Sequence, residues 1–513
     1  MLTKIYGSAI IGVHAQTITI EVNAFKGVKY YLVGLPDNAV KESQFRIRSA
    51  LSQSGYKMPG KKIIINMAPA DLKKEGACFD LPIALGILQA SGQMDAEHLS
   101  KYVIMGELSL DGGLQPLRGA LSMAVQARKE GFKGIILPQA NAREAAVVEG
   151  IDVYGAERLQ DVVQFLTTGL GLVPTVLSYS GLSSSKNLYA DLPDMEDVKG
   201  QSTARRGLEI AAAGGHNILL IGPPGVGKSM LAKRIPSILP PLSLQEALET
   251  TQVHSIAGQL DAQSALMTQR PFRSPHHTVS HVALAGGGSN PLPGEISLAH
   301  NGVLFLDELP EFQRQALEVL RQPLEDRKVS ISRTRLSVEY PSSFMLVASM
   351  NPSPSGNFYS PNDPESDPWH VVRRYLSKVS GPLLDRIDIH VEVTPVSIDD
   401  LTSKPLGEKS ESIRERVIQA REIQEKRFKR IKKVHCNAQL TPKMIRKHCD
   451  IEPTAEKLLR KAIDKMDLSA RAYTRILKVS RTIADLRGEK LIQELHIAEA
   501  VRYRCMDRPY YRI

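Results

Sequence analysis

Cysteine is scarce in this sequence, and long apolar runs are missing. Four cysteines in 513 residues exclude a disulfide framework as the source of stability. No apolar run reaches the roughly 20 residues that a membrane-spanning helix needs. The start of the chain lacks a secretory signal pattern, because the short apolar stretch 8–13 runs directly into the alternating residues 17–20. We therefore expect a cytoplasmic protein that makes no membrane contact.

The composition is that of an ordinary globular protein with a basic excess. A chain of 513 residues exceeds one hydrophobic core, so about two to four domains are expected. Lysine and arginine number 65 against 55 acidic residues, a net charge of +10. Positive charge favours polyanionic partners, because each neutralised phosphate releases bound counterions. A basic surface also aids solubility, so charge alone leaves nucleic acid as one of two alternatives.

The pattern along the chain predicts three domains and a linker. Residues 1–175 mix strand-like and helix-like runs, 176–196 form a Ser-rich linker, 197–400 alternate strands with helices, and 401–513 are helical and charged. In the first domain we expect strands at 17–22, 29–34, 62–66 and 134–137, and helices at 79–89 and 119–129. In the last domain we expect helices at 412–433, 455–466, 470–487 and 496–504.

A phosphate-binding loop follows a short apolar strand at 217–221. Residues 222–229 read GPPGVGKS and fit the pattern G-x-x-x-x-G-K-[ST]. In this pattern glycines let the backbone wrap a phosphate, whose charge meets backbone N–H groups and a helix N-terminus. Lys228 would reach the β- and γ-phosphates, and Ser229 would offer its hydroxyl to Mg²⁺. The residues predicted to bind ATP are Gly222, Pro223, Pro224, Gly225, Val226, Gly227, Lys228 and Ser229.

Two carboxylates end the next apolar strand, 303–306. We expect Asp307 to hold the Mg²⁺ shell and Glu308 to polarise the attacking water. The alternative is a strand that ends in two solvated acids, which the preceding phosphate-binding loop disfavours.

Two further polar residues are candidates for the same reaction. The strand 344–350 ends at Asn351, which would orient water against the γ-phosphate, although Asn-Pro is also a plain turn dipeptide. Arg386 lies between an apolar helix and a strand, where it could reach a neighbouring subunit as an arginine finger. The alternative is a surface arginine that pairs with Asp385 or Asp388.

Residues 197–400 resemble the AAA+ ATPases of the magnesium-chelatase and MCM branch. Residues 197–201 (DVKGQ) resemble the lead-in to the phosphate loop, 294–302 (GEISLAHNG) the helix-2 insert, and 328–340 the pre-sensor-1 hairpin. In the C-terminal helical lid, 469–472 (SARA) matches the sensor-2 position. The resemblance implies that Arg471 touches the γ-phosphate, with Arg475 as the alternative.

The whole chain is similar to the bacterial ComM/YifB family. The most specific stretches are 270–278 (RPFRSPHHT), 286–288 (GGG) and 293–300 (PGEISLAH). The resemblance implies a homo-hexameric, ATP- and Mg²⁺-dependent DNA motor. Such a motor drives branch migration during natural transformation, with single-stranded or branched DNA and possible recombination proteins as partners. The alternatives are a protein-remodelling or metal-chelatase-type ATPase and an ATP-dependent protease.

The hairpin tip carries the candidates for DNA contact. Arg333 and Arg335 stand at the tip, and Arg327 and Lys328 stand at its base. In a ring, such hairpins would project into the pore and grip phosphates without reading sequence. The alternative is a solvated hairpin without a ligand.

The first domain resembles the Lon protease fold. The similarity centres on 74–82 (KEGACFDLP) and 112–119 (GGLQPLRG), and Cys78 stands at the nucleophile position while Gln115 replaces the lysine base. A thiolate is a strong nucleophile, but Gln115 cannot activate it. We therefore expect a non-proteolytic domain that forms rings or binds DNA. The basic residues that favour DNA are Lys57, Lys61, Lys62, Lys73, Lys74 and Arg118.

Histidines and cysteines leave a metal site as a minor alternative. The first group is His276, His277 and His281, which we expect in a loop that faces DNA or a neighbouring subunit. The second group is His435, Cys436, His448, Cys449 and Cys505, whose spacing fits no zinc finger or ribbon. Taken together, the sequence predicts an α/β protein with three parts: a Lon/S5-like α+β domain, an AAA+ P-loop parallel sheet with its two inserts, and a helical lid.

Overall fold

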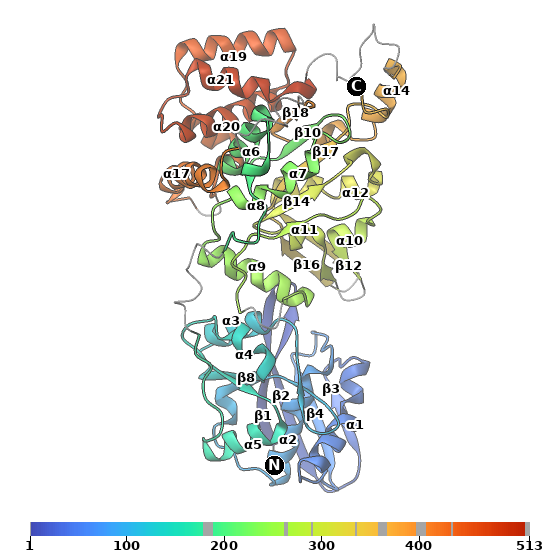
Figure 1. Ribbon diagram of the computed structural model, residues 1–513. Coiled ribbons are helices and arrows are strands. Elements are labelled where there is room, and N and C mark those ends of the chain that lie inside the picture. Colours follow the sequence, from blue (N-terminus) through green and yellow to red (C-terminus); the bar gives the residue numbers. More distant parts are fainter. Residues whose placement is uncertain are drawn as a thin grey trace. The chain divides into compact units, whose positions relative to one another are not determined.

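The computed structural model describes residues 2–177, 188–260, 265–288, 291–333, 336–357, 367–396, 407–431 and 434–507 (Figure 1). The predicted Ser-rich stretch 178–185 lies outside these ranges. The chain forms two compact units. The first contains Met1–Ser183, Leu244–Met267 and Ser332–Tyr340, and the second contains the remainder.

A seven-stranded mixed sheet organises the first unit, in the order β3-β4-β2-β1-β5-β8-β9. Its strands are β1 (Leu2–Ile11), β2 (His14–Phe25), β3 (Tyr30–Val33), β4 (Lys62–Ala68), β5 (Tyr102–Ile104), β8 (Gly134–Pro138) and β9 (Asp152–Ala156). Its helices are α1 (Asn38–Gln53), α2 (Asp80–Ser91), α3 (Ala120–Lys129), α4 (Gln139–Ala145) and α5 (Leu159–Thr168). The sequence pattern located β2, β3, β4, β8, α2 and α3 to within a few residues.

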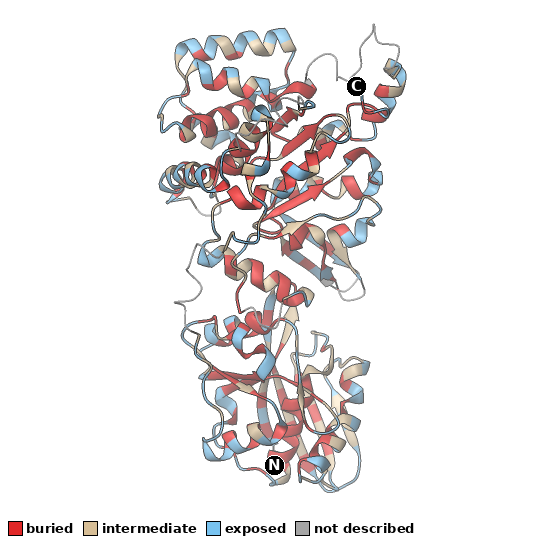
Figure 2. Ribbon diagram, viewed as in Figure 1, coloured by how far each residue is buried: buried red, intermediate tan, exposed pale blue. Residues whose placement is uncertain are grey.

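Helix α2 is buried along almost its whole length (Figure 2). It lies so close to the sheet that a Cβ on Gly86 would come within 2.5 Å of the Val22 side chain. A side chain at this position would therefore force the helix away from strand β2. The face of the sheet that carries Val22 is thus covered by α2.

A helix from the middle of the chain also belongs to the first unit. Helix α9 (Leu244–Ala257) packs beside α3, where Ser255 Oγ accepts a hydrogen bond from the Gly119 N–H at 2.9 Å and donates to Glu144 Oε1 at 2.5 Å. Burial raises the pKa of Glu144, and the bond from Ser255 opposes this shift.

The hairpin strand β16 (Leu336–Pro341) also contacts the first unit's sheet. The turn between β1 and β2 leaves no room for a Cβ on Gly12 (φ +60°), because that atom would lie 2.6 Å from the Val338 side chain.

A five-stranded parallel sheet organises the second unit, in the order β11-β14-β17-β10-β18. The strands are β10 (Ile218–Ile221), β11 (Phe272–Arg273), β14 (Val303–Leu306), β17 (Met345–Met350) and β18 (Ile389–Glu392). Strands β10, β14 and β17 are buried throughout, as continuous apolar runs in a covered parallel sheet should be.

Short helices surround this sheet, and the two predicted inserts lie between its strands in the sequence. The helices are α6 (Ser202–Gly214), α7 (Lys228–Lys233), α8 (Ile235–Ile238), α10 (His281–Ala285), α11 (Glu295–Leu298), α12 (Arg314–Glu318), α13 (Arg321–Asp326), α14 (Trp369–Leu376) and α15 (Gly381–Leu384). Strands β12 (Gly286–Gly287) and β13 (Leu292–Pro293) pair just before the stretch 294–302, the predicted helix-2 insert, and that stretch contains α11. Strands β15 (Lys328–Arg333) and β16 (Leu336–Pro341) form the predicted hairpin.

The C-terminal region is helical, as the charge and periodicity predicted. It contains α17 (Ser410–Phe428), α18 (Pro442–His448), α19 (Pro453–Met466), α20 (Ala470–Leu486) and α21 (Glu494–Arg502). The Ser469 hydroxyl caps α20 by accepting from the Ala472 N–H. Among the described helices, none is long and apolar enough to cross a bilayer.

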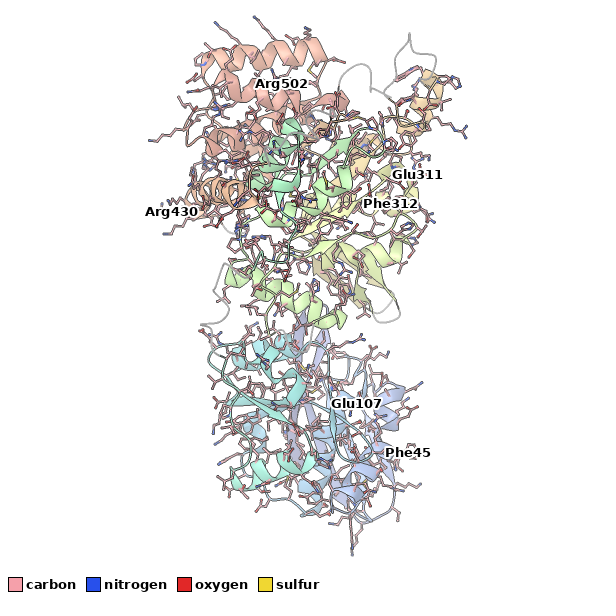
Figure 3. The ribbon with its side chains drawn as sticks, in the orientation of Figure 1. Phe45, Glu107, Glu311, Phe312, Arg430 and Arg502 are labelled. Atoms are coloured by element: carbon pink, nitrogen blue, oxygen red, sulfur yellow. The ribbon has the colours of Figure 1, made fainter. Side chains whose placement is uncertain are left out.

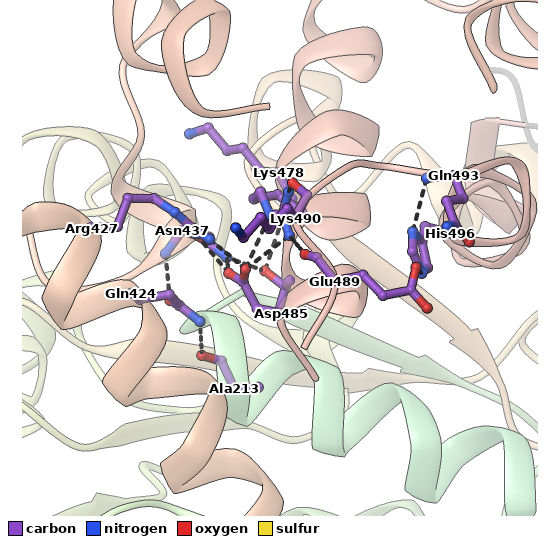
Figure 4. A network of polar contacts seen from close by, with 12 residues as sticks. Ala213, Gln424, Arg427, Asn437, Lys478, Asp485, Glu489, Lys490, Gln493 and His496 are labelled. Carbon is purple, nitrogen blue, oxygen red and sulfur yellow. Dashed lines mark hydrogen bonds and ion pairs between the residues drawn. The ribbon is translucent and has the colours of Figure 1, made fainter. Parts of the chain in front are cut away.

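A buried polar network joins the lid helices to one another and to the core (Figure 4). The Asp485 carboxylate on α20 accepts from Arg427 of α17 at 2.8 Å, from Asn437 at 2.7 Å and from Arg481 at 3.1 Å. Gln424 of α17 donates to the Ala213 carbonyl of α6 at 3.0 Å. Asp485, Arg427, Asn437, Arg481 and Gln424 all have hydrogen-bond partners, so the lid is held by directed bonds as well as by apolar packing.

Candidate nucleotide-binding and catalytic site

The phosphate-binding loop connects β10 to α7 at the carboxyl end of the parallel sheet. Gly225 and Gly227 have φ values of +79° and +92°, which favour glycine. A Cβ on Gly222 would lie 2.2 Å from the Val393 carbonyl. The glycines of the motif are therefore required by backbone conformation and by close packing.

Lys228 is nearly buried and uses its ammonium group within the loop. Nζ donates to the carbonyls of Gly222 at 2.6 Å and Pro223 at 2.7 Å, and to Asn351 Oδ1 at 2.9 Å. Burial lowers the pKa of Lys228, and the nearby carboxylates of Asp307 and Glu308 act against this shift. The predicted loop lysine and the predicted strand-end asparagine are thus in direct contact.

The Asp307 carboxylate, just after the end of β14, accepts hydrogen bonds from two serine hydroxyl groups. It accepts a hydrogen bond from Ser229 Oγ at 2.6 Å on one carboxylate oxygen and one from Ser349 Oγ on the other. Ser349 also accepts the Glu308 N–H at 3.3 Å. Hydroxyl and carboxylate oxygens are the ligands that Mg²⁺ prefers, so Ser229 and Asp307 fit a magnesium ion. The sequence had not singled out Ser349, because a serine inside an apolar strand carries no motif.

Glu308 occupies an unusual backbone position beside a histidine. Its φ is +54°, a left-handed conformation that is rare for a residue with a side chain. Its carboxylate is largely exposed and lies 3.7 Å from His277 Nδ1. His277 in turn stacks against His276, with ring centroids 4.0 Å apart. The loop of the predicted histidine group therefore reaches the candidate catalytic carboxylate.

The other histidine of that group is placed differently. His281 begins α10, whereas His277 lies in the preceding loop, so the two do not share a helix face. Among the residues that the structure describes, no group of three or more His, Cys, Asp or Glu side chains could hold a metal ion.

A pocket of about 510 Å³ opens beside Glu308 and Asn351. Lys378 lies at its wall, where Nζ pairs with Glu311 Oε1 at 3.0 Å. Figure 3 shows Glu311 and its neighbour Phe312 in this part of the unit. The lining residues are Glu308, Glu311, Asn351, Pro354, Val371, Arg374, Tyr375 and Lys378. Two cations of this wall, Arg374 and Lys378, were missed from the sequence because they belong to no motif.

Arg386 lies at the opposite edge of the same sheet. The Arg386 carbonyl accepts a hydrogen bond from the Asn217 side chain at 2.9 Å. Asn217 lies immediately before the first residue of β10, whereas Lys228 lies beyond the carboxyl end of that strand. The Arg386 guanidinium pairs with Glu325 at 2.6 Å and donates to the Pro382 carbonyl, and its side chain is 11% exposed. The partner is thus neither of the two aspartates considered from the sequence. The length of β10, roughly 10 Å, separates Arg386 from its own phosphate loop.

The lid arginines gather near Arg386. Arg471 pairs with Asp385 at 3.1 Å, and Arg475 pairs with the buried Asp388, which also contacts His216 at 3.2 Å. Burial favours neutral Asp388, but Arg475 and His216 outweigh it and hold the pKa of this carboxyl well below its usual range. The structure therefore makes two groups: Lys228, Ser229, Asp307, Glu308 and Asn351 at one edge, and Arg386 with Arg471 and Arg475 at the other.

One of the two candidate DNA contacts stands at the end of strand β15. Arg333 is the last residue of that strand, while Arg335 lies outside the described residues. Lys74, named above among the basic residues that favour DNA, is fully buried, and its ammonium donates to the backbone carbonyls of Pro69 and Leu72. Lys74 is therefore not available to a polyanion.

The protease-like position in the first unit holds a thiol with a raised pKa. Burial and then the nearby carboxylate of Asp80 raise the pKa of Cys78 to about 12. Gln115 lies in the short strand β7 (Leu114–Gln115) and pairs in register with Glu107. The charge of Glu107 raises the pKa of Cys78 further. An activated nucleophile needs the reverse, a lowered pKa.

Models of known protein families match residues in both units. The family described as magnesium chelatase, subunit ChlI, matches residues 194–401. Subunit ChlI of Mg-chelatase matches 20–141, and the ChlI C-terminal family matches 407–504.

Individual relatives cover the whole chain. The competence protein ComM of Haemophilus influenzae is 46% identical over 512 residues, 99% of this chain and 98% of that protein. The uncharacterized protein YifB of Escherichia coli is 46% identical over 513 residues, with the same coverage. Lon protease 2 of Bacillus subtilis is 30% identical over 158 residues, 28% of this chain and 27% of that protein. The chain therefore belongs to the ComM/YifB family of magnesium chelatase-like AAA+ proteins with an N-terminal Lon protease-like domain.

Proposed function

We propose that this protein hydrolyses ATP at the cluster formed by Lys228, Ser229, Asp307, Glu308 and Asn351. The direct contacts of Lys228 with Asn351 and of Ser229 with Asp307 carry the proposal, because they bring three separate sequence elements to one edge of the sheet. Phosphate oxygens would compete with the loop carbonyls for the Lys228 ammonium. Mg²⁺ held by Ser229 and Asp307 would neutralise charge on the phosphates. Glu308 polarises the attacking water, and Asn351 orients it.

Arg386 completes this site from a neighbouring subunit. It lies one strand length from its own phosphate loop, so it can act on the γ-phosphate only in another copy. Arg471 is tied to the neighbouring Asp385 and acts from the same side. A ring of identical subunits, which we take to be a hexamer, supplies this geometry to every site.

The work done by the ring is DNA branch migration. The relative from Haemophilus influenzae is called a competence protein, and the net charge of +10 suits a polyanionic partner. We infer a cytoplasmic motor that moves single-stranded or branched DNA, through Arg333 and Arg335 of the hairpin, as incoming DNA is integrated during natural transformation. The Lon-like domain serves as a ring-forming or DNA-binding platform.

The ATPase rate with and without DNA tests this proposal. It should be measured with single-stranded, duplex and four-way-junction DNA, with the Glu308→Gln variant as the blank. We expect stimulation, greatest with single-stranded or branched DNA, followed by strand exchange on a junction substrate. An intact ATPase that ignores every DNA would instead favour protein remodelling or a chelatase-type role.

A protease role has a separate test. Cleavage of an unfolded protein substrate by the wild type, lost in Cys78→Ala, would support proteolysis. The raised pKa of Cys78 leads us to expect no cleavage by either form.

A further inference from the structure

The edge of the seven-stranded sheet carries an exposed surface that combines aromatic rings with lysines. We call it the β3 face and define it by Phe25, Tyr31 and Lys62 with the flanking lysines 26, 29 and 61. Phe25 ends β2, Tyr31 lies in the edge strand β3, and Lys62 begins β4. Phe25 and Tyr31 are 39% and 42% exposed, which is high for residues of a sheet.

Successive side chains of a strand point to opposite faces of the sheet, and this alternation places Phe25, Tyr31 and Lys62 on the same face. Phe25 pairs in register with Lys62, and Tyr31 pairs with Ile64. Their immediate neighbours along each strand point the other way, toward the core under α2: Ala24 and Ile63 are buried. The β3 face is therefore the side of the sheet that α2 does not cover.

Lys62 holds the two rings together. Its ammonium lies 5.2 Å from the centroid of the Phe25 ring and 5.2 Å from that of Tyr31. These cation–π contacts restrict both rings without covering their outer surfaces. A cation is thus fixed between two ring faces that a ligand can reach.

The surrounding charge has a single sign. Residues 25–36 and 57–66 contain five lysines and no acidic residue. Within the described part of the chain, none of these lysines forms an ion pair. Glu21, an acid farther along β2, is already engaged by Lys4 at 3.3 Å and by Asn66 at 3.1 Å. The β3 face therefore presents unneutralised positive charge.

We propose that the β3 face binds single-stranded DNA, with one base stacked on each ring and lysines on the phosphates. Base stacking on aromatic side chains combined with a basic path is how proteins hold single strands regardless of sequence. Duplex DNA offers no free base faces, and two copies of this surface would repel each other through their lysines. The proposal rests on the proposed DNA function and adds a contact outside the ATPase unit.

Affinity measurements on the full-length protein test the stacking. Fluorescein-labelled oligothymidylate should be titrated without ATP, and anisotropy recorded. We expect Phe25→Ala with Tyr31→Ala, which removes both stacking contacts, to weaken binding by roughly 30-fold or more, while Tyr31→Phe keeps the ring and stays near wild type. Phe45→Ala is the matched control, because Phe45 is a 72% exposed aromatic residue on helix α1 and not on the strands of the β3 face.

The lysines have a separate readout. Lys62→Ala should reduce the slope of log affinity against log salt by about 1, whereas exposed Lys129→Ala on α3 should not. Cross-linking of wild-type protein to a bromodeoxyuridine oligonucleotide should map to the peptides that contain Phe25 or Tyr31. This measurement stands even if an alanine variant folds poorly.

The outcomes separate this inference from the proposed function. If the wild type neither binds DNA nor responds to it in ATPase rate, both fail. If the wild type does both, and the ring variants bind as tightly as wild type without cross-links at this face, only the β3 face is overturned. Ring variants with unchanged DNA affinity and an altered sedimentation coefficient would make the face a contact between copies, which also overturns the proposal.

Discussion

Ser349 offers the sharpest test of how Asp307 is positioned. It is fully buried in β17, and its hydroxyl donates to the Asp307 carboxylate that we assign to Mg²⁺. In Ser349→Ala one oxygen of that carboxylate loses its partner. A hydrogen bond to a charged group contributes about 1.5–3 kcal/mol, which corresponds to roughly 10- to 150-fold in an equilibrium constant. Loss of a residue that orients a metal ligand weakens metal affinity by roughly 10- to 100-fold.

The assay is the steady-state ATPase rate as a function of free Mg²⁺ at constant ATP. We expect the half-saturating Mg²⁺ concentration to rise by roughly 10- to 100-fold, with the maximal rate restored at high Mg²⁺. Ser342→Ala is the matched control, because Ser342 is also buried and its hydroxyl has no partner among the described residues. An unchanged Mg²⁺ requirement, or a lost rate that Mg²⁺ does not restore, would refute the role assigned to Ser349.

Three further predictions concern the subunit contact, the thiol and the lid. Arg386→Ala and Glu308→Gln should each abolish ATPase activity. Mixing the two variants should recover part of the activity, because some interfaces then unite an intact Arg386 with an intact Glu308. If no activity is recovered, Arg386 acts in the site of its own subunit. Cys78, with a pKa raised from 9.0 to about 12, should react with iodoacetamide near pH 8 roughly 1,000-fold more slowly than an ordinary thiol and faster as pH rises; ordinary reactivity in the Cys78 peptide by mass spectrometry would contradict this. Asp485→Asn should destabilise the lid by about 3–5 kcal/mol, seen as a lower melting temperature, because Arg427 and Arg481 lose their buried counter-charge. Glu456→Gln, at an exposed pair with Arg460, should leave the melting temperature unchanged.

The parts of the site that lie in continuous sequence could be predicted. The strand before Gly222, the glycines and Lys228 form one local unit whose geometry is set by neighbouring residues. Asp307 and Glu308 follow an apolar strand, and parallel strands bring their carboxyl ends together. The Lys228–Asn351 contact follows from the same rule, although 123 residues separate the two.

Contacts made by loops and by isolated side chains could not be predicted. His277 reaches Glu308 from a loop, and no periodicity fixes where a loop points. Arg374 and Lys378 lie four apart on a charged surface, a spacing that fits any solvated helix as well as a pocket wall. Lys74 shows the opposite error, because a charged residue was expected at the surface and is buried with its ammonium bonded to backbone carbonyls.

The return of helix α9 to the first unit could not be predicted either. The sequence of 197–400 predicts alternating strands and helices but not which surface each helix covers. The partner is defined by Glu144, which lies 111 residues before Ser255 and whose buried carboxylate needs that hydroxyl. Long-range pairing of this kind depends on the completed fold.

The discontinuity of the first unit has a consequence for partial digestion. The chain passes between the units at 183/184, 243/244, 267/268, 331/332 and 340/341. A single cut in the Ser-rich stretch 178–185 severs one of these five passages, and α9 stays packed against α3 although it is now on the other fragment. The two fragments should therefore migrate together on a sizing column and separate only under denaturing conditions. Neither the first 175 residues nor the remainder, produced alone, would contain the whole of the unit to which α9 belongs.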